Sequence, residues 1–122
     1  MNALIVDDSR TTRLILRTLL RQLGFDVAEA GGAHAGLDHL KQFPETSLVL
    51  VDWSMPDVDG IAFIREVRAA GRSEIQLLMI SAEEGAGQAA TAMAAGANGF
   101  ISKPFTRETI ARQLKLLEIG QG

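Results

Sequence analysis

The stretch Ser47-Leu-Val-Leu-Val51 ends in an uninterrupted apolar run, and Asp52 follows it directly. A strand that is apolar on both of its faces is expected where helices cover both sides of a parallel sheet. Further along the chain, Gln76-Leu-Leu-Met-Ile80 is a second run of the same type. These two runs predict buried strands of a parallel sheet in an α/β protein.

Shorter strand-like runs alternate with helical patterns on either side of these two runs. The other predicted strands are Asn2–Val6, Phe25–Glu29 and Gly99–Ile101, and the predicted helices run from Ser9 toward Gly24, from Ala33 to Gln42, from Asp59 or Gly60 to Ala70, from Gly87 to Ala95, and onward from the cap Thr106. Five strands, each followed by a helix, predict a doubly wound (βα)5 fold with right-handed crossovers. Alternation alone does not determine strand order, and we expect the flavodoxin-like order 2-1-3-4-5. We also expect one domain, residues 1–122.

The composition excludes several classes of protein. With 47% hydrophobic and 22% charged residues, the chain is expected to be globular and soluble. Its net charge of −3 argues against a dedicated nucleic-acid surface. No apolar run approaches the roughly 18 residues of a membrane span, and no signal peptide is recognisable. A cytoplasmic protein without cysteine chemistry is therefore the expectation.

Four arginines recur on one side of the first predicted helix: Arg10, Arg13, Arg17 and Arg21. The simplest interpretation is the solvated face of an amphipathic helix. A docking surface for a partner is the alternative.

Polar side chains follow four of the five predicted strands. Asp7 and Asp8 come after the first strand, Asp52 after the third, Ser81 after the fourth and Lys103 after the fifth. In open parallel sheets, ligands bind beyond the carboxyl ends of the strands. Asp8 alone is also explained as a helix cap and Lys103 as a surface residue, but together these residues predict a functional site.

Three crowded carboxylates need either a bound cation or a raised pKa on one of them. An all-oxygen site with few protein ligands suits Mg²⁺, and Mn²⁺ is expected to substitute. With a divalent ion bound, Asp52 becomes a candidate nucleophile toward a phosphoryl group. Lys103 and Ser81 can then stabilise the other phosphoryl oxygens.

Four stretches of the chain form an ordered set of motifs: Leu4-Ile-Val-Asp-Asp8, Val49-Leu-Val-Asp-Trp-Ser-Met-Pro-Asp-Val-Asp-Gly60, Met79-Ile-Ser-Ala82 and Gly99-Phe-Ile-Ser-Lys-Pro-Phe105. With these motifs the chain resembles the receiver domain of two-component response regulators, especially single-domain receivers of the chemotaxis type. The resemblance spans almost the whole chain, and this ordered set of motifs is highly specific.

The resemblance implies a role for each acidic residue of the site. Asp52 would be the phosphorylation site and, with Asp8, a direct ligand of Mg²⁺. Asp7 would act mainly through water, and the backbone carbonyl of Ser54 would supply a further metal ligand. Ser54 and Glu83 would also tune how fast the phosphoryl group is hydrolysed.

It implies a switch as well. Lys103 would contact the phosphoryl group, and the Lys103–Pro104 peptide is expected to be cis. The hydroxyl of Ser81 would move toward the phosphoryl group, and Phe100 would then rotate inward. A buried strand residue is the alternative interpretation of Phe100. The face formed by the fourth helix, fifth strand and fifth helix would bind a target or form a homodimer.

The function implied is a signalling switch, not a turnover enzyme. A sensor histidine kinase or histidine phosphotransfer protein would phosphorylate Asp52, an unidentified target protein would respond, and slow self-hydrolysis would end the signal. No direct nucleic-acid or membrane partner is expected. Two alternatives are an aspartate-nucleophile phosphatase, disfavoured because Ser54 replaces the expected second acid, and a degenerate receiver that acts only as an interaction module.

Overall fold

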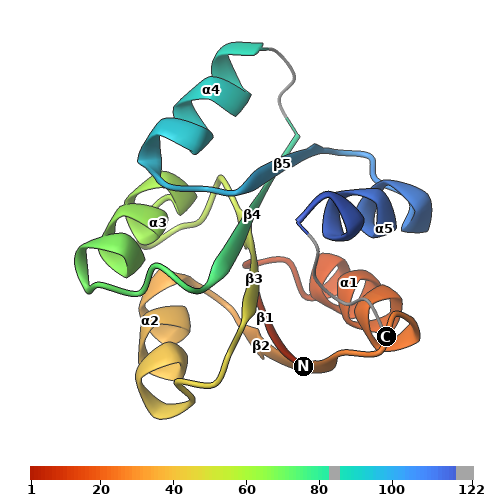
Figure 1. The fold of residues 1–122 in the computed structure, drawn as a ribbon, viewed down its shortest axis with the longest axis horizontal. Coiled ribbons are helices and arrows are strands. Elements are labelled where there is room, and N and C mark those ends of the chain that lie inside the picture. Colours follow the sequence, from red (N-terminus) through yellow and green to blue (C-terminus); the bar gives the residue numbers. More distant parts are fainter. Residues whose placement is uncertain (83–85, 118–122) are drawn as a thin grey trace.

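A five-stranded parallel sheet runs through the middle of the molecule (Figure 1). The computed structural model describes residues 1–82 and 86–117. The strand order is β2-β1-β3-β4-β5, which confirms the predicted doubly wound, flavodoxin-like fold. The strands are β1 (Asn2–Val6), β2 (Asp26–Ala30), β3 (Leu48–Asp52), β4 (Gln76–Ser81) and β5 (Gly99–Ser102). The helices are α1 (Arg10–Gln22), α2 (Ala33–Gln42), α3 (Gly60–Ala69), α4 (Ala86–Ala95) and α5 (Arg107–Leu116).

Helices cover both faces of the sheet. Figure 1 shows α2, α3 and α4 on one face and α1 and α5 on the other. Each strand therefore divides its side chains between two cores, because successive residues of a strand point to opposite faces. In β1, Leu4 and Val6 pack toward α2 and α3, whereas Ala3 and Ile5 pack toward α1 and α5.

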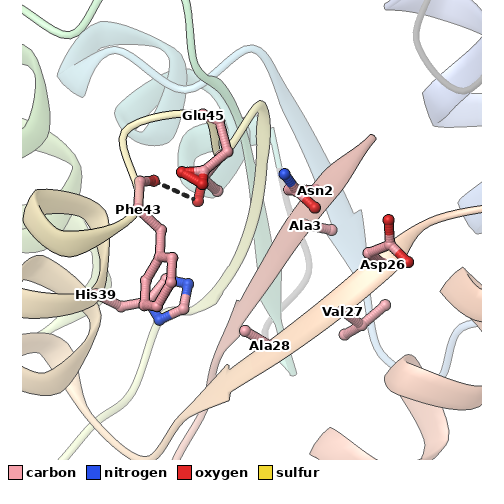
Figure 2. Close-up of a pocket in the computed structure, with 9 residues that line it drawn as sticks. Asn2, Ala3, Asp26, Val27, Ala28, His39, Phe43 and Glu45 are labelled. Carbon is pink, nitrogen blue, oxygen red and sulfur yellow. Dashed lines mark hydrogen bonds between the residues drawn. The ribbon is translucent and has the colours of Figure 1, made fainter.

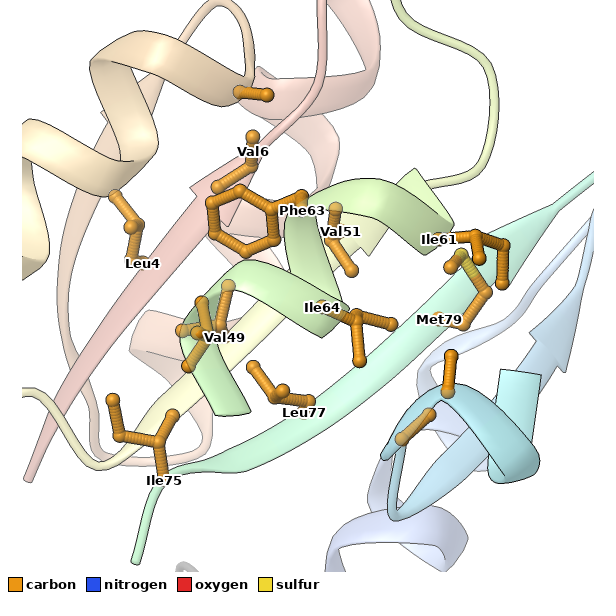
Figure 3. Packing of buried hydrophobic residues seen from close by; sticks show 14 of the residues in the cluster. Leu4, Val6, Val49, Val51, Ile61, Phe63, Ile64, Ile75, Leu77 and Met79 are labelled. Carbon is orange, nitrogen blue, oxygen red and sulfur yellow. The ribbon is translucent and has the colours of Figure 1, made fainter. Parts of the chain in front are cut away.

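The core under α2, α3 and α4 is built around one aromatic ring (Figure 3). Phe63 of α3 is fully buried among aliphatic side chains from the central strands. Those strand residues are Leu4, Val6, Val49, Val51, Leu77 and Met79. All five residues of β3 are buried, as expected for a strand covered on both faces.

Helix boundaries follow the capping chemistry of the sequence. The side chains of Ser9, Asp59 and Thr106 accept hydrogen bonds from first-turn amides of α1, α3 and α5. Gly24 has a φ of +96°, a conformation that favours glycine, and it ends the α1 segment.

Several strands extend one residue beyond the predicted end. Asp52 still pairs with Ile80, and Ser81 with Ser102, so both polar residues belong to the strands that carry them. The prediction placed the strand ends where apolar side chains stop, but backbone pairing continues beyond that point. The site residues are consequently held by the sheet ladder.

A shallow pocket of about 260 Å³ lies at the opposite edge of the sheet (Figure 2). Asn2 and Asp26, the first residues of β1 and β2, line it together with the stacked rings of His39 and Phe43. The hydroxyl of Thr46 donates to the Phe43 carbonyl at 2.8 Å beside it. Because the first residues of β1 and β2 line this pocket, it lies away from the carboxyl ends of the strands.

None of the described helices is long and apolar enough to cross a membrane.

Candidate functional site

Three carboxylates meet at the carboxyl edge of the sheet. Asp7 and Asp8 follow β1, and Asp52 is the last residue of the neighbouring strand β3. One carboxylate oxygen from each residue lies within 4.8 Å of those from the other two. The parallel pairing of β1 with β3 thus produces the acidic cluster that the sequence predicted.

Lys103 brings a positive charge to this cluster from the end of β5. Its Nζ donates to Oδ1 of Asp52 at 3.3 Å and lies 4.0 Å from Oδ2 of Asp7. The backbone amide of Lys103 donates to the Ser81 carbonyl at 2.7 Å, which ties the residue to β4. The Lys103–Pro104 peptide bond is cis.

Burial disfavours the ionised form of Asp7 and Asp52. Asp7 and Asp52 are 1% and 8% exposed. Desolvation raises the pKa of both groups above the ordinary value, although the nearby charge of Lys103 opposes the shift. The charge of Lys103 therefore does not fully offset the desolvation of the two carboxylates, and the cluster can accommodate a further positive charge.

The donor set fits a hard divalent cation. Oδ1 of Asp7 accepts a hydrogen bond from the Ser9 amide at 2.8 Å, whereas its buried Oδ2 has no hydrogen-bond partner among the residues that the structure describes. Asp8, by contrast, is exposed to solvent. Oxygen ligands that leave room for several waters are what Mg²⁺ prefers, and the cluster of Asp7, Asp8 and Asp52 is of this kind.

The loop after Asp52 passes close to the site. Its two ends are joined by a hydrogen bond from the Gly60 amide to the Trp53 carbonyl, at 2.8 Å. A Cβ at Gly60 would collide with the Asp52 carbonyl, so only glycine permits this close approach. Ser54, the expected source of a metal-binding carbonyl, is exposed in this loop.

The predicted switch residues lie on adjacent strands. Ser81 is 3% exposed at the end of β4, and Phe100 is half-buried on β5 against the core beneath α4. The ring of Phe100 meets the indole of Trp53 edge to face. Both interpretations of Phe100, as a switch and as a core residue, are compatible with a half-buried side chain. Glu83 lies outside the described residues.

The arginine side of α1 is less solvated than expected. Arg13 and Arg17 both pair with Glu29 at the edge strand β2, at 3.1 and 2.9 Å. Arg13 also donates to the backbone carbonyl of Asp7 at 2.7 Å and is only 18% exposed. Sequence periodicity alone missed this contact, because Arg13 and Glu29 are 16 positions apart. The arginine thus supports the backbone that carries the acidic pair.

The carboxyl edge of the sheet carries three carboxylates, a lysine and a buried hydroxyl. These groups define a candidate phosphoryl-transfer and metal site. Comparison with known proteins identifies the family of the chain. A family model described as the response regulator receiver domain matches residues 3–115. The chain belongs to the response regulator receiver domain family.

Among curated proteins, the chain is 37% identical to the chemotaxis protein CheY1 of Helicobacter pylori, over 96% of each chain. Among solved structures, CheY in a CheX-CheY-BeF₃-Mg complex from Borrelia burgdorferi superposes with a TM-score of 0.91 at 26% identity. That alignment covers 98% of this chain and 90% of the other. A probable two-component response regulator with a GGDEF domain is 36% identical and superposes with a TM-score of 0.86. That alignment covers 97% of this chain and 50% of the other. The chain is thus a receiver domain of the CheY type, a class of signalling switch.

Proposed function

We propose that Asp52 accepts a phosphoryl group from the phosphohistidine of a sensor kinase or histidine phosphotransfer protein. The observation that supports this most directly is the convergence of Asp7, Asp8 and Asp52 within 4.8 Å, with Lys103 3.3 Å from Asp52. In the transfer, a carboxylate oxygen of Asp52 forms a bond to phosphorus while the phosphorus–nitrogen bond breaks. The electron pair leaves with the imidazole, which is then protonated.

Each residue of the site contributes a separate task. Asp7, Asp8, Asp52 and the Ser54 carbonyl would hold Mg²⁺, which when bound neutralises charge on the transferring phosphoryl group. Lys103 pairs with a second phosphoryl oxygen, and Ser81 donates a hydrogen bond to a third. The relative from Borrelia burgdorferi, named with BeF₃ and Mg²⁺ bound, supports this assignment by analogy.

The output is a change in the face formed by α4, β5 and α5. Phosphorylation draws Ser81 toward Asp52 and allows Phe100 to turn inward, so that a target protein or a second copy of the chain binds this face. Slow self-hydrolysis, tuned by Ser54 and Glu83, returns the protein to its resting state. We assign this cycle to the cytoplasm, as for a chemotaxis-type receiver.

A small donor with a phosphorus–nitrogen bond tests the proposal. Phosphoramidate with Mg²⁺ should label the protein, and hydroxylamine should release the label because it cleaves acyl phosphates. The Asp52→Asn variant should remain unlabelled. Label that resists hydroxylamine, or labelling of Asp52→Asn to the wild-type extent, would refute transfer to this carboxylate.

A further inference from the structure

Asp57 joins the loop that follows Asp52 to the start of α2, an element distant in sequence. Its Oδ1 accepts from the amide of Ala33 at 3.2 Å, and its Oδ2 accepts from the amide of His34 at 3.1 Å. These amides belong to the first turn of α2, where backbone N–H groups lack partners within the helix. Asp57 therefore performs the capping role that a residue of the helix itself usually performs.

Glycine at position 32 makes room for this contact. Gly32 is the N-cap of α2 and has no side chain with which to cap the helix. A Cβ at this position would lie 3.0 Å from both carboxylate oxygens of Asp57. The sequence of α2 thus leaves its N-terminus open, and the incoming carboxylate of Asp57 occupies the space.

Charge strengthens the contact. The amides of His34 and Ala33 and the nearby Val58 backbone lower the pKa of Asp57 to about 2. The helix N-terminus also favours a negative charge at this position. Asp57 is consequently ionised over the physiological pH range.

This contact is the main polar restraint on the middle of the loop. Among described residues, the bonds to Ala33 and His34 are the hydrogen bonds that join residues 54–58 to another element. Met55 and Val58 add apolar packing against the core beneath α2, α3 and α4. Ser54, three positions before Asp57, lies in the same short segment.

We propose that Asp57 is a positioning residue of the metal site: its contact with α2 holds the acceptor loop so that the Ser54 carbonyl is available to Mg²⁺. This inference rests on the proposed function, which assigns that carbonyl as a ligand. Pro56 lies between the two residues and has a restricted φ, so a displacement of Asp57 is passed along the backbone. Loss of the contact frees the segment and weakens metal binding without removing a ligand.

The test compares two loop aspartates that cap different helices. Asp57→Ala removes the contact with α2, whereas Asp59→Ala removes the cap of α3, where Asp59 accepts from Ala62 at 2.8 Å. Isothermal titration with Mg²⁺ alone, without a phosphodonor, should show an affinity about tenfold lower for Asp57→Ala. Asp59→Ala should lose thermal stability and keep the wild-type affinity.

Gly32→Ala disturbs the same contact from the helix side and should also weaken Mg²⁺ binding. In metal-free protein, amide exchange at Ala33 and His34 should accelerate in Asp57→Ala but not in Asp59→Ala. Accelerated exchange with unchanged Mg²⁺ affinity, or equal losses of affinity in Asp57→Ala and Asp59→Ala, would overturn the inference alone. A wild-type protein that fails to bind Mg²⁺ would overturn the proposed function and this inference with it.

Discussion

The indole ring of Trp53 meets the phenyl ring of Phe100 edge to face, with ring centroids 6.5 Å apart and an interplanar angle of 81°. Trp53 adjoins Asp52, the proposed phosphoacceptor, and Phe100, the proposed switch residue, lies on β5. The single tryptophan of the chain therefore contacts the residue whose rotation is expected on activation. This pair connects the site to the α4-β5-α5 face.

Trp53 fluorescence should report both metal binding and phosphorylation. Mg²⁺ should change the emission, and acetyl phosphate should change it again as Phe100 turns away from the indole. In Phe100→Leu the edge-to-face contact is lost, so the phosphate-dependent change should shrink while the Mg²⁺-dependent change remains. An identical phosphate-dependent change in Phe100→Leu would show that the ring of Phe100 does not move relative to Trp53.

Replacement of Lys103 should separate metal binding from phosphoryl transfer. Its ammonium lies 3.3 Å from Asp52 and competes with a cation for the carboxylates. Lys103→Gln should therefore retain or improve Mg²⁺ affinity, yet lower the rate of phosphorylation by about a hundredfold, because a charged partner of the phosphoryl group is lost. Stopped-flow fluorescence with acetyl phosphate measures the rate. Wild-type kinetics in Lys103→Gln would rule out a role in transfer.

The buried carboxylates predict an unusual pH dependence of stability in metal-free protein. Because the folded-state pKa of Asp52 is raised above 3.8, the unfolded chain loses its proton first as the pH rises. The free energy of unfolding therefore falls as the pH rises above 3.8, and this loss is complete once the pH exceeds the raised pKa of folded Asp52. Asp52→Asn should be more stable than wild type near pH 7, and the difference should shrink toward pH 4, as measured by urea denaturation in EDTA.

Asp57 serves as a control, because its pKa is shifted in the opposite direction to that of Asp52. Its pKa is lowered to about 2, so its stabilising effect is present above the ordinary value of 3.8 and disappears as the pH falls toward 2. Asp57→Asn should accordingly be less stable than wild type near pH 7. If Asp52→Asn were destabilised there as well, burial would not be the main influence on Asp52.

Helix α4 should be held more loosely than α1. Ala92 is fully buried, but the one large apolar side chain of α4, Met93, is 48% exposed. Helix α1, by contrast, buries Leu16 and Leu20. Little apolar area therefore opposes local opening of α4. Hydrogen exchange should show faster amide exchange in α4, and equal protection of the two helices would remove the argument for a mobile α4.

The fold and the main site were predictable from the sequence because their signals are local. Apolar runs marked the strands, and the residue after each run lies at the carboxyl edge by the geometry of parallel strands. This geometry predicts that Asp7, Asp52 and Lys103 lie together, and Lys103 Nζ is 4.0 Å from Asp7 and 3.3 Å from Asp52. Alternation alone does not determine strand order, and the order 2-1-3-4-5 is expected because it is a common order of doubly wound sheets.

The supporting contacts were not predictable, because they join residues that are far apart in sequence and leave no periodic pattern. The sequence predicts a solvated face for Arg13, yet Arg13 contacts Glu29 and the Asp7 carbonyl. Asp57 carries no local signal of its contact, because the helix that it caps begins 24 positions earlier. Likewise, the reason for glycine at position 32 is the approach of Asp57, which the sequence does not indicate.

The central claim is that Asp52 is the phosphoacceptor, and intact-mass spectrometry tests it most directly. With acetyl phosphate and Mg²⁺, the wild-type protein should gain a single adduct of about 80 Da, and peptide mapping should place it on Asp52. EDTA or the Asp52→Asn substitution should abolish the adduct. No adduct on the wild-type protein, under conditions that label a control receiver, or an adduct that persists in Asp52→Asn, would contradict the account.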